Sequence, residues 1–150
     1  MKFDKVVNTK REDVDIPTEW LYTINKPDST PKKIIFYNNS IGTLLQQNEK
    51  MIAKMKSVFE IFKENRNEVA LLCRSHPLIE STLTVMRSQL WEAYKAICNQ
   101  YLAEGWGIYD DIADIDQAIV VSDAYYGDGS SVVQLYQRTG KPVMILNADI

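Results

Sequence analysis

The sequence predicts an α/β fold: a Rossmann-like, three-layer domain built around one parallel, five-stranded sheet. Two patterns predict it. Short apolar runs rich in β-branched and aromatic residues alternate with stretches in which apolar residues recur every three or four positions. Each connection between successive runs is long enough to hold the crossover helix that parallel strands require.

The first half of the chain is expected to hold two strands and two helices. A lead-in segment, residues 1–32, carries three of the five prolines and is expected to pack on the outside of the domain through Trp20 and Leu21. The Rossmann-like domain then spans residues 33–150. Its first strand covers residues 34–37 and is followed by a helix over residues 44–62.

The second predicted strand covers residues 69–73 and ends in a loop marked by a proline. A single long helix follows, because one apolar stripe runs from Leu83 to Tyr101 before the stop at Gly105. A very short third strand covers residues 108–109.

The last part repeats the alternation. Asp114 is expected to cap a short helix that ends at Val121. A fourth strand over residues 124–127, a helix over residues 130–139 and a last strand over residues 143–146 complete the series.

Ligands of such sheets bind outside the carboxyl ends of the strands, so the informative residues follow each strand. Ser40 follows the first strand, and Asp128 and Gly129 lie in the loop after the fourth. In that loop Ser130 and Ser131 begin a helix, whose N-terminus favours an anion. The loop is therefore a phosphate site in outline. The alternative is that Ser130 or Asp128 only caps the helix and the glycines make the turn, since the spacing is neither that of a Walker loop nor G-x-G-x-x-G.

Arg74 and His76 end the second strand, where both side chains can approach the same phosphate. His76 is the only histidine, so any acid–base step by an imidazole must use it. The alternative is a loop histidine bonded to the backbone. Tyr109 ends the third strand, where a base can be sandwiched, but the pattern of tyrosines there favours strand and helix packing over a stacking platform.

Other chemistries fit less well. The aspartates between residues 110 and 128 lack the spacing of a calcium loop, so no metal site and no cofactor are expected. Ser130 and Asp128 are too close together for a Ser-His-Asp hydrolase. The net charge is −3, with no basic run, so no nucleic-acid partner is expected. With two cysteines, and neither a signal peptide nor a spanning helix in the sequence, we expect a cytoplasmic protein, which is compatible with peripheral contact at the inner face of a membrane.

Two motifs in order resemble the CDP-glycerol glycerophosphotransferase family. Residues 71–78, LLCRSHPL, resemble its RxHP strand end, and residues 115–132, IDQAIVVSDAYYGDGSSV, resemble its segment running from a helix through SD and a strand to DYSSV. Those enzymes build polymers of the teichoic-acid type on a GT-B fold of two Rossmann-like halves. Residues 33–150 resemble the C-terminal, donor-binding half. Gly129 departs from the family pattern, which usually has an aromatic residue there.

The resemblance implies a donor site. Ser130 and Ser131 are implied to hold the donor phosphate, Arg74 and His76 to approach the same diphosphate, and the backbone around Tyr109 to meet the base. The implied partners are a nucleotide-diphosphate donor, CDP-glycerol or a nucleotide sugar, and a separate N-terminal acceptor half or a second copy of the chain. We expect the isolated chain to be inactive, with His76 placed to stabilise a departing phosphate. The alternative is a non-catalytic nucleotide-binding or assembly module.

Overall fold

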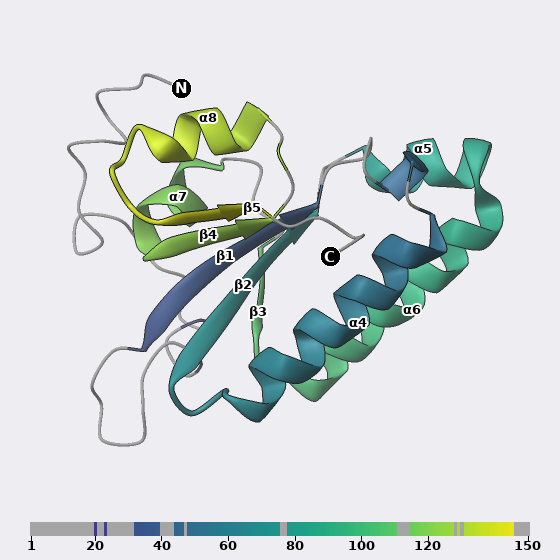
Figure 1. Cartoon of the computed structure of the whole chain (residues 1–150). Helices are drawn as coiled ribbons and strands as arrows, with labels where there is room; N and C mark the ends of the chain where they lie inside the picture. The colour runs from purple at the N-terminus through teal and green to yellow at the C-terminus, as the bar shows by residue number, and fades with distance from the viewer. Residues whose placement is uncertain are drawn as a thin grey trace.

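The strands of the computed structural model form one parallel sheet (Figure 1). The structure describes Trp20, Thr23 and residues 32–39, 44–46, 48–75, 78–110, 115–127, 129 and 131–145. Within these residues the sheet has five strands in the order β3-β2-β1-β4-β5, and every neighbouring pair is parallel. The strands are β1 (Lys33–Asn39), β2 (Val69–Ser75), β3 (Ile108–Asp110), β4 (Ala124–Gly127) and β5 (Val143–Ile145). The predicted fold class is confirmed.

Helices cover both faces of this sheet, as the three-layer prediction requires. The helices on one face are α4 (Glu49–Glu64), α5 (Ile79–Met86) and α6 (Ser88–Glu104), whose buried residues share one apolar cluster. The helices on the other face are α7 (Asp116–Val121) and α8 (Ser131–Gln137), whose buried residues share a second cluster. Figure 1 shows α4 and α6 side by side at one end of the sheet, away from α7 and α8.

The two clusters follow from the alternation of side chains along each strand. In β1, Ile34 and Phe36 are fully buried in the α7/α8 cluster, whereas Tyr37 is fully buried in the α4/α6 cluster. Both faces of β1 are therefore covered, as expected for a central strand of a parallel sheet. Trp20 from the lead-in segment is also buried in the α7/α8 cluster. Leu21 and Asp114 lie outside the described residues.

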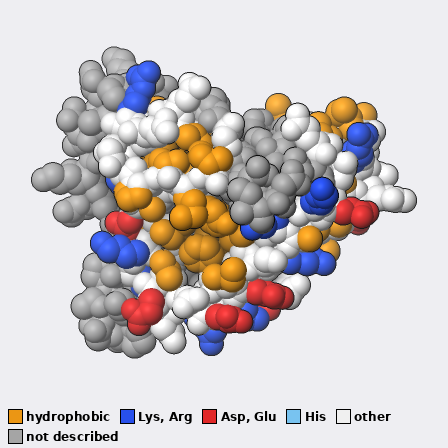
Figure 2. All heavy atoms as spheres, in the orientation of Figure 1, with side chains coloured by type: hydrophobic (Ala, Val, Ile, Leu, Met, Phe, Trp, Pro, Cys, Tyr) orange, Lys and Arg blue, Asp and Glu red, His pale blue; other side chains and the backbone are white. Residues whose placement is uncertain are grey.

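Part of the sheet keeps an apolar surface. α4 and α6 pack on β2 and β3, while hydrophobic side chains stay visible beside α4 on the same face (Figure 2). Tyr126 and Ile35 are half-buried there, and Met144 of β5 is 65% exposed. Among the described residues, no helix is both long and apolar enough to cross a membrane.

The predicted single helix after β2 is two helices. Arg87 has an extended backbone, with φ −149° and ψ 69°, and separates α5 from α6. Its N–H still donates to the Leu83 carbonyl oxygen at 2.8 Å, and its own carbonyl oxygen accepts from the Trp91 N–H at 3.0 Å. Leu83 and Leu90 are both buried and lie seven positions apart, a spacing that keeps the apolar stripe in phase across the break. α6 ends as predicted, at Gly105 with φ 68°.

The strand order reverses between β1 and β4. From β1 the chain builds outward to β2 and β3, and then returns to pair β4 with the other side of β1. In sheets of this kind the carboxyl ends of the strands at such a reversal flank the ligand crevice. The register brings one row of residues to this edge, in the order Asp110, Arg74, Asn38, Gly127, Ile145.

Candidate functional site at the carboxyl edge

The row at the carboxyl edge faces the α7/α8 layer. Residues two positions earlier on β1, β2 and β3 are Phe36, Leu72 and Ile108, and all three belong to the α7/α8 cluster. Since side chains two apart on a strand share a face, Asn38, Arg74 and Asp110 share that face. These three polar residues, which are all buried, form the centre of the candidate site.

Arg74 and Asp110 form a buried ion pair. Nη1 of Arg74 donates to Oδ2 of Asp110 at 3.0 Å, and the two side chains are 7% and 0% exposed. The pair exists because β2 and β3 are neighbours and the two residues are in register. Each charge offsets the cost of burying the other, so neither residue is dispensable alone. Arg74 thus lies at the predicted edge, with Asp110 taking up part of its charge.

Asn38 and Tyr125 mark the point where the strand order reverses. Nδ2 of Asn38 donates to the hydroxyl of Tyr125 at 3.4 Å. Gly127, the last residue of β4, leaves no room for a side chain: an added Cβ would overlap the Asn38 carbonyl oxygen and lie 2.8 Å from the Tyr125 hydroxyl. The backbones of β1 and β4 therefore approach closely here, and the end of β4 carries no side chain that would obstruct a ligand.

The connection that follows β4 is short, as predicted. Residues 128–130 link Gly127 to Ser131, where α8 begins. The start of α8 therefore lies at the carboxyl edge of the sheet, and Gly129 is exposed, with open space around it. Asp128 and Ser130 lie outside the described residues, and only the backbone of Ser131 is described. Their phosphate-binding roles stay predictions.

The remaining predicted site residues fall in two groups. Ser40 and His76 lie outside the described residues, so their roles also stay predictions. Tyr109 is half-buried and packs against the α4/α6 cluster, on the opposite face of the sheet from Arg74. The part of the chain that the structure describes has no group of three or more metal-ligating side chains placed to hold an ion.

Cys73 does not have the environment of a nucleophile. It precedes Arg74 on β2, and its side chain is buried in the α4/α6 cluster with Cys98. Burial raises the pKa of the Cys73 thiol well above its usual range, and the nearby Cys98 adds to the shift. A neutral, buried thiol is a packing residue and not a reactive one.

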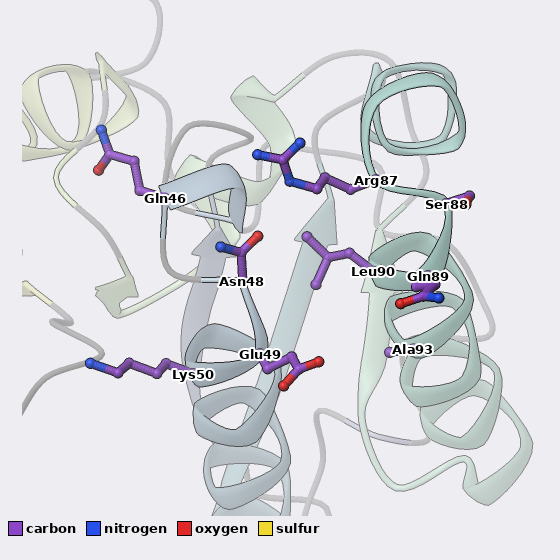
Figure 3. A pocket seen from close by; sticks show the side chains of 9 residues that line it. All are labelled: Gln46, Asn48, Glu49, Lys50, Arg87, Ser88, Gln89, Leu90 and Ala93. Carbon is purple, nitrogen blue, oxygen red and sulfur yellow. The ribbon is translucent and has the colours of Figure 1, made fainter.

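A hollow lies beside this edge, between the starts of α4 and α6, and is called the α4–α6 hollow below (Figure 3). Its volume is about 700 Å³. Since α4 follows β1, and α5 and α6 follow β2, these helices begin near the carboxyl ends of the strands. The lining residues are Gln46, Asn48, Glu49, Lys50, Arg87, Ser88, Gln89, Leu90 and Ala93.

Sequence reasoning missed this hollow because its lining residues form no motif. One of them has an unusual backbone: Asn48, just before α4, has φ 50° and ψ −122°. A residue other than glycine adopts that conformation at a cost of about 1–3 kcal/mol. The break at Arg87, where α5 ends and α6 begins, likewise has no glycine or proline to signal it.

No family model matches this chain, and no curated protein matches it. Solved structures of the wall teichoic acid polymerase TagF do resemble it. For a histidine-to-asparagine variant soaked with CDPG for 15 minutes the TM-score is 0.52 at 20% identity, covering 96% of this chain and 29% of that chain. For the same variant after a 30-minute soak the TM-score is 0.46 at 21% identity, covering 85% of this chain and 26% of that chain. For the variant without a soak the TM-score is 0.47 at 18% identity, covering 95% of this chain and 28% of that chain.

The chain thus spans less than a third of the length of the TagF structure with the 0.52 score. At 20% identity this likeness concerns the fold. The parallel sheet with helices on both faces, described above, is similar to the fold of part of a wall teichoic acid polymerase.

Proposed function

We propose that this chain is the donor-binding domain of a transferase that builds a cell-wall or capsular polymer of the teichoic-acid type. In this proposal it holds a nucleotide-activated glycerol or sugar by its diphosphate. The observation that carries the proposal is the reversal of strand order between β1 and β4. Asn38 lies at the end of β1 on one side of it, and Gly127, which has no side chain, ends β4 on the other. The likeness in fold to TagF supports it.

The proposal assigns roles to the loops at this edge. Ser130 and Ser131 bind the diphosphate together with Asp128 and Gly129, and Ser40 contributes to the same donor site. Arg74 is held in place by Asp110 and contributes positive charge at the edge. The backbone around Tyr109 is assigned to the base. His76 stabilises the negative charge that develops on the departing phosphate.

A non-catalytic nucleotide-binding module is the second candidate. The observation that favours it is the ion pair, because Asp110 takes up part of the positive charge of Arg74 that a departing phosphate needs. The two candidates differ in transfer, not in binding. Transfer also needs a positioned acceptor, an effect worth about 7–11 kcal/mol, so in both cases we expect the isolated chain to bind the donor without transferring from it.

Calorimetric titration with cytidine and uridine diphosphates tests the donor site. Replacing Ser130 and Ser131 together by alanine is expected to weaken binding by about 1–3 kcal/mol, the usual loss when hydrogen bonds to a charged group are removed. Ser57→Ala, an exposed serine in the middle of α4, is the matched control and should bind like the wild type. Equal affinity of the double variant and the wild type would show that the serine loop only caps α8.

A transfer assay separates the two candidates. The chain is incubated with a nucleotide-activated glycerol and a polymeric acceptor, with and without the N-terminal half of a related transferase. Activity that appears only with that half, and is lost in His76→Ala, supports the enzyme. Robust transfer by the chain alone would contradict the expectation that it is inactive in isolation.

A further inference from the structure

We propose that the α4–α6 hollow is a second subsite, which binds a polyol phosphate: a glycerol-phosphate unit of the growing polymer, held away from the reacting end. The inference rests on the proposed function, because it supplies the polymer that the donor would extend. It concerns residues on the opposite face of the sheet from the Arg74–Asp110 pair. Two features carry it: the size and place of the hollow, and the chemistry of its walls.

The hollow has the dimensions and position of a ligand site. Its volume of about 700 Å³ lies within the range of about 300–1,000 Å³ that small-molecule sites occupy. It opens beside the carboxyl ends of β1 and β2, the edge where sheets of this class bind ligands. A polymer bound there would reach the same edge of the sheet as the predicted donor site, from the opposite face.

Its walls present polar groups from two elements toward one space. Figure 3 shows Arg87 reaching from the start of α6 toward α4, with Asn48 and Glu49 at the start of α4 facing the same gap. These three side chains are exposed, whereas Leu90 is buried and forms an apolar side. An apolar ligand would bury these polar groups without replacing their hydrogen bonds, so the walls favour a polar one.

Of the described residues, two cationic ones line the hollow; Figure 3 shows Arg87 facing the gap between α4 and α6 and Lys50 pointing away from it, so the walls match a polyol with one anionic group. Nη1 of Arg87 donates to the Met86 carbonyl oxygen at 3.1 Å, which uses one of the five N–H donors of a guanidinium and holds the group at the rim. The planar fork of an arginine suits a phosphate. The Glu49 carboxylate repels an anion but accepts hydrogen bonds from hydroxyls, and the Asn48 amide both donates and accepts. The phosphate is therefore placed at Arg87 and the hydroxyls at α4.

The test is a titration of the full chain with an oligomer of glycerol phosphate, followed by calorimetry. Arg87→Gln is expected to raise the dissociation constant about ten- to a hundredfold, because charge-assisted hydrogen bonds to the phosphate are lost. Arg66→Gln is the matched control. Arg66 is also exposed, and its Nη1 also donates to a backbone carbonyl oxygen, that of Lys63 at 2.8 Å, but it lies in the turn between α4 and β2, at the amino edge of the sheet.

Three further probes define the ligand. Glycerol 3-phosphate is expected to bind more weakly than the oligomer, and glycerol and inorganic phosphate more weakly still. Glu49→Gln should reduce the preference for glycerol phosphate over inorganic phosphate while leaving the affinity for phosphate unchanged or higher. Thermal melting of both variants verifies that the fold is retained, since these side chains are exposed and a loss of folding is not expected.

Several outcomes would overturn the inference. They are no oligomer binding by the wild type, equal weakening by Arg87→Gln and Arg66→Gln, or inorganic phosphate binding as tightly as glycerol phosphate. Nucleotide binding by Arg87→Gln should equal that of the wild type. If the wild type binds the oligomer through Arg87 but binds no nucleotide, the proposed donor function fails and this subsite stands.

Discussion

Removing the charge of Asp110 is expected to cost the protein a large part of its stability. Asp110→Asn keeps the shape of the side chain but removes the negative charge beside the Arg74 guanidinium, which is 7% exposed. Two unit charges 3.0 Å apart attract by about 5.5 kcal/mol at an effective dielectric constant of 20. Breaking buried pairs from one side costs about 3–5 kcal/mol. We therefore expect the free energy of unfolding to fall by about 3–5 kcal/mol. This is a large part of the total free energy of unfolding of a typical protein, which is about 5–15 kcal/mol.

Urea denaturation followed by tryptophan fluorescence measures this loss. The double variant Arg74→Met/Asp110→Leu removes both charges and fills the space with apolar atoms, so its stability should return to near the wild-type value or exceed it. Lys63→Met is the matched control, because its ion pair with Glu104 is shorter, at 2.7 Å, but exposed. That variant should have a urea midpoint close to the wild type, since exposed pairs contribute little.

Equal shifts of the urea midpoint in Asp110→Asn and Lys63→Met would contradict this prediction. A double variant that is less stable than Asp110→Asn would contradict it as well. Either result would mean that burial does not determine the strength of the pair at the carboxyl edge.

Three further predictions concern local features. Gly127→Ala should lower the free energy of unfolding, measured in urea, by about 1–3 kcal/mol, because the added Cβ would overlap the backbone of β1. Gly129→Ala is the control and should be neutral or slightly stabilising, because Gly129 has open space around it. Equal effects of the two substitutions would contradict the close approach of β1 and β4. Asn48→Gly should raise the thermal midpoint by relieving a φ of 50°, and a lower midpoint would show that no strain is stored there. Burial raises the pKa of Cys73 and of Tyr101 in the folded state. The unfolded thiol and phenol lose protons above about pH 8.5 and 10, so the unfolded state then binds fewer protons and stability falls as pH rises, by up to about 1.4 kcal/mol per pH unit for each group. Urea midpoints that stay constant up to pH 11 would contradict this.

The elements could be predicted because each carries its own local pattern. Ile34 and Phe36 alternate with Ile35 and Tyr37 along β1. This alternation puts the first pair against the α7/α8 layer and the second pair against the α4/α6 layer, whatever the order of the strands. The break at Arg87 could not be predicted in this way. An apolar spacing of seven between buried positions is compatible with one helix or with two, and no glycine or proline intervenes.

The contacts of the site depend on strand order and register, which the sequence alone does not determine. Arg74 was expected at the carboxyl edge, and it lies there. Its bond to Asp110 requires β2 and β3 to be neighbours with those two residues in register. The α4–α6 hollow depends in the same way on where two helices begin relative to each other, and on the extended backbone at Arg87.

The central claim, that a nucleotide diphosphate binds at the carboxyl edge of the sheet, is tested most directly by mapping the bound nucleotide on the backbone amides. The ¹⁵N-labelled chain is titrated with cytidine diphosphate, and amide shifts are followed by nuclear magnetic resonance. We expect saturable shifts at the ends of β1 and β4, at Asn38 and Gly127, and at the start of α8, with no change in the turn between α4 and β2 around Arg66. Saturable shifts centred on that turn, or no shifts at millimolar nucleotide, would contradict it.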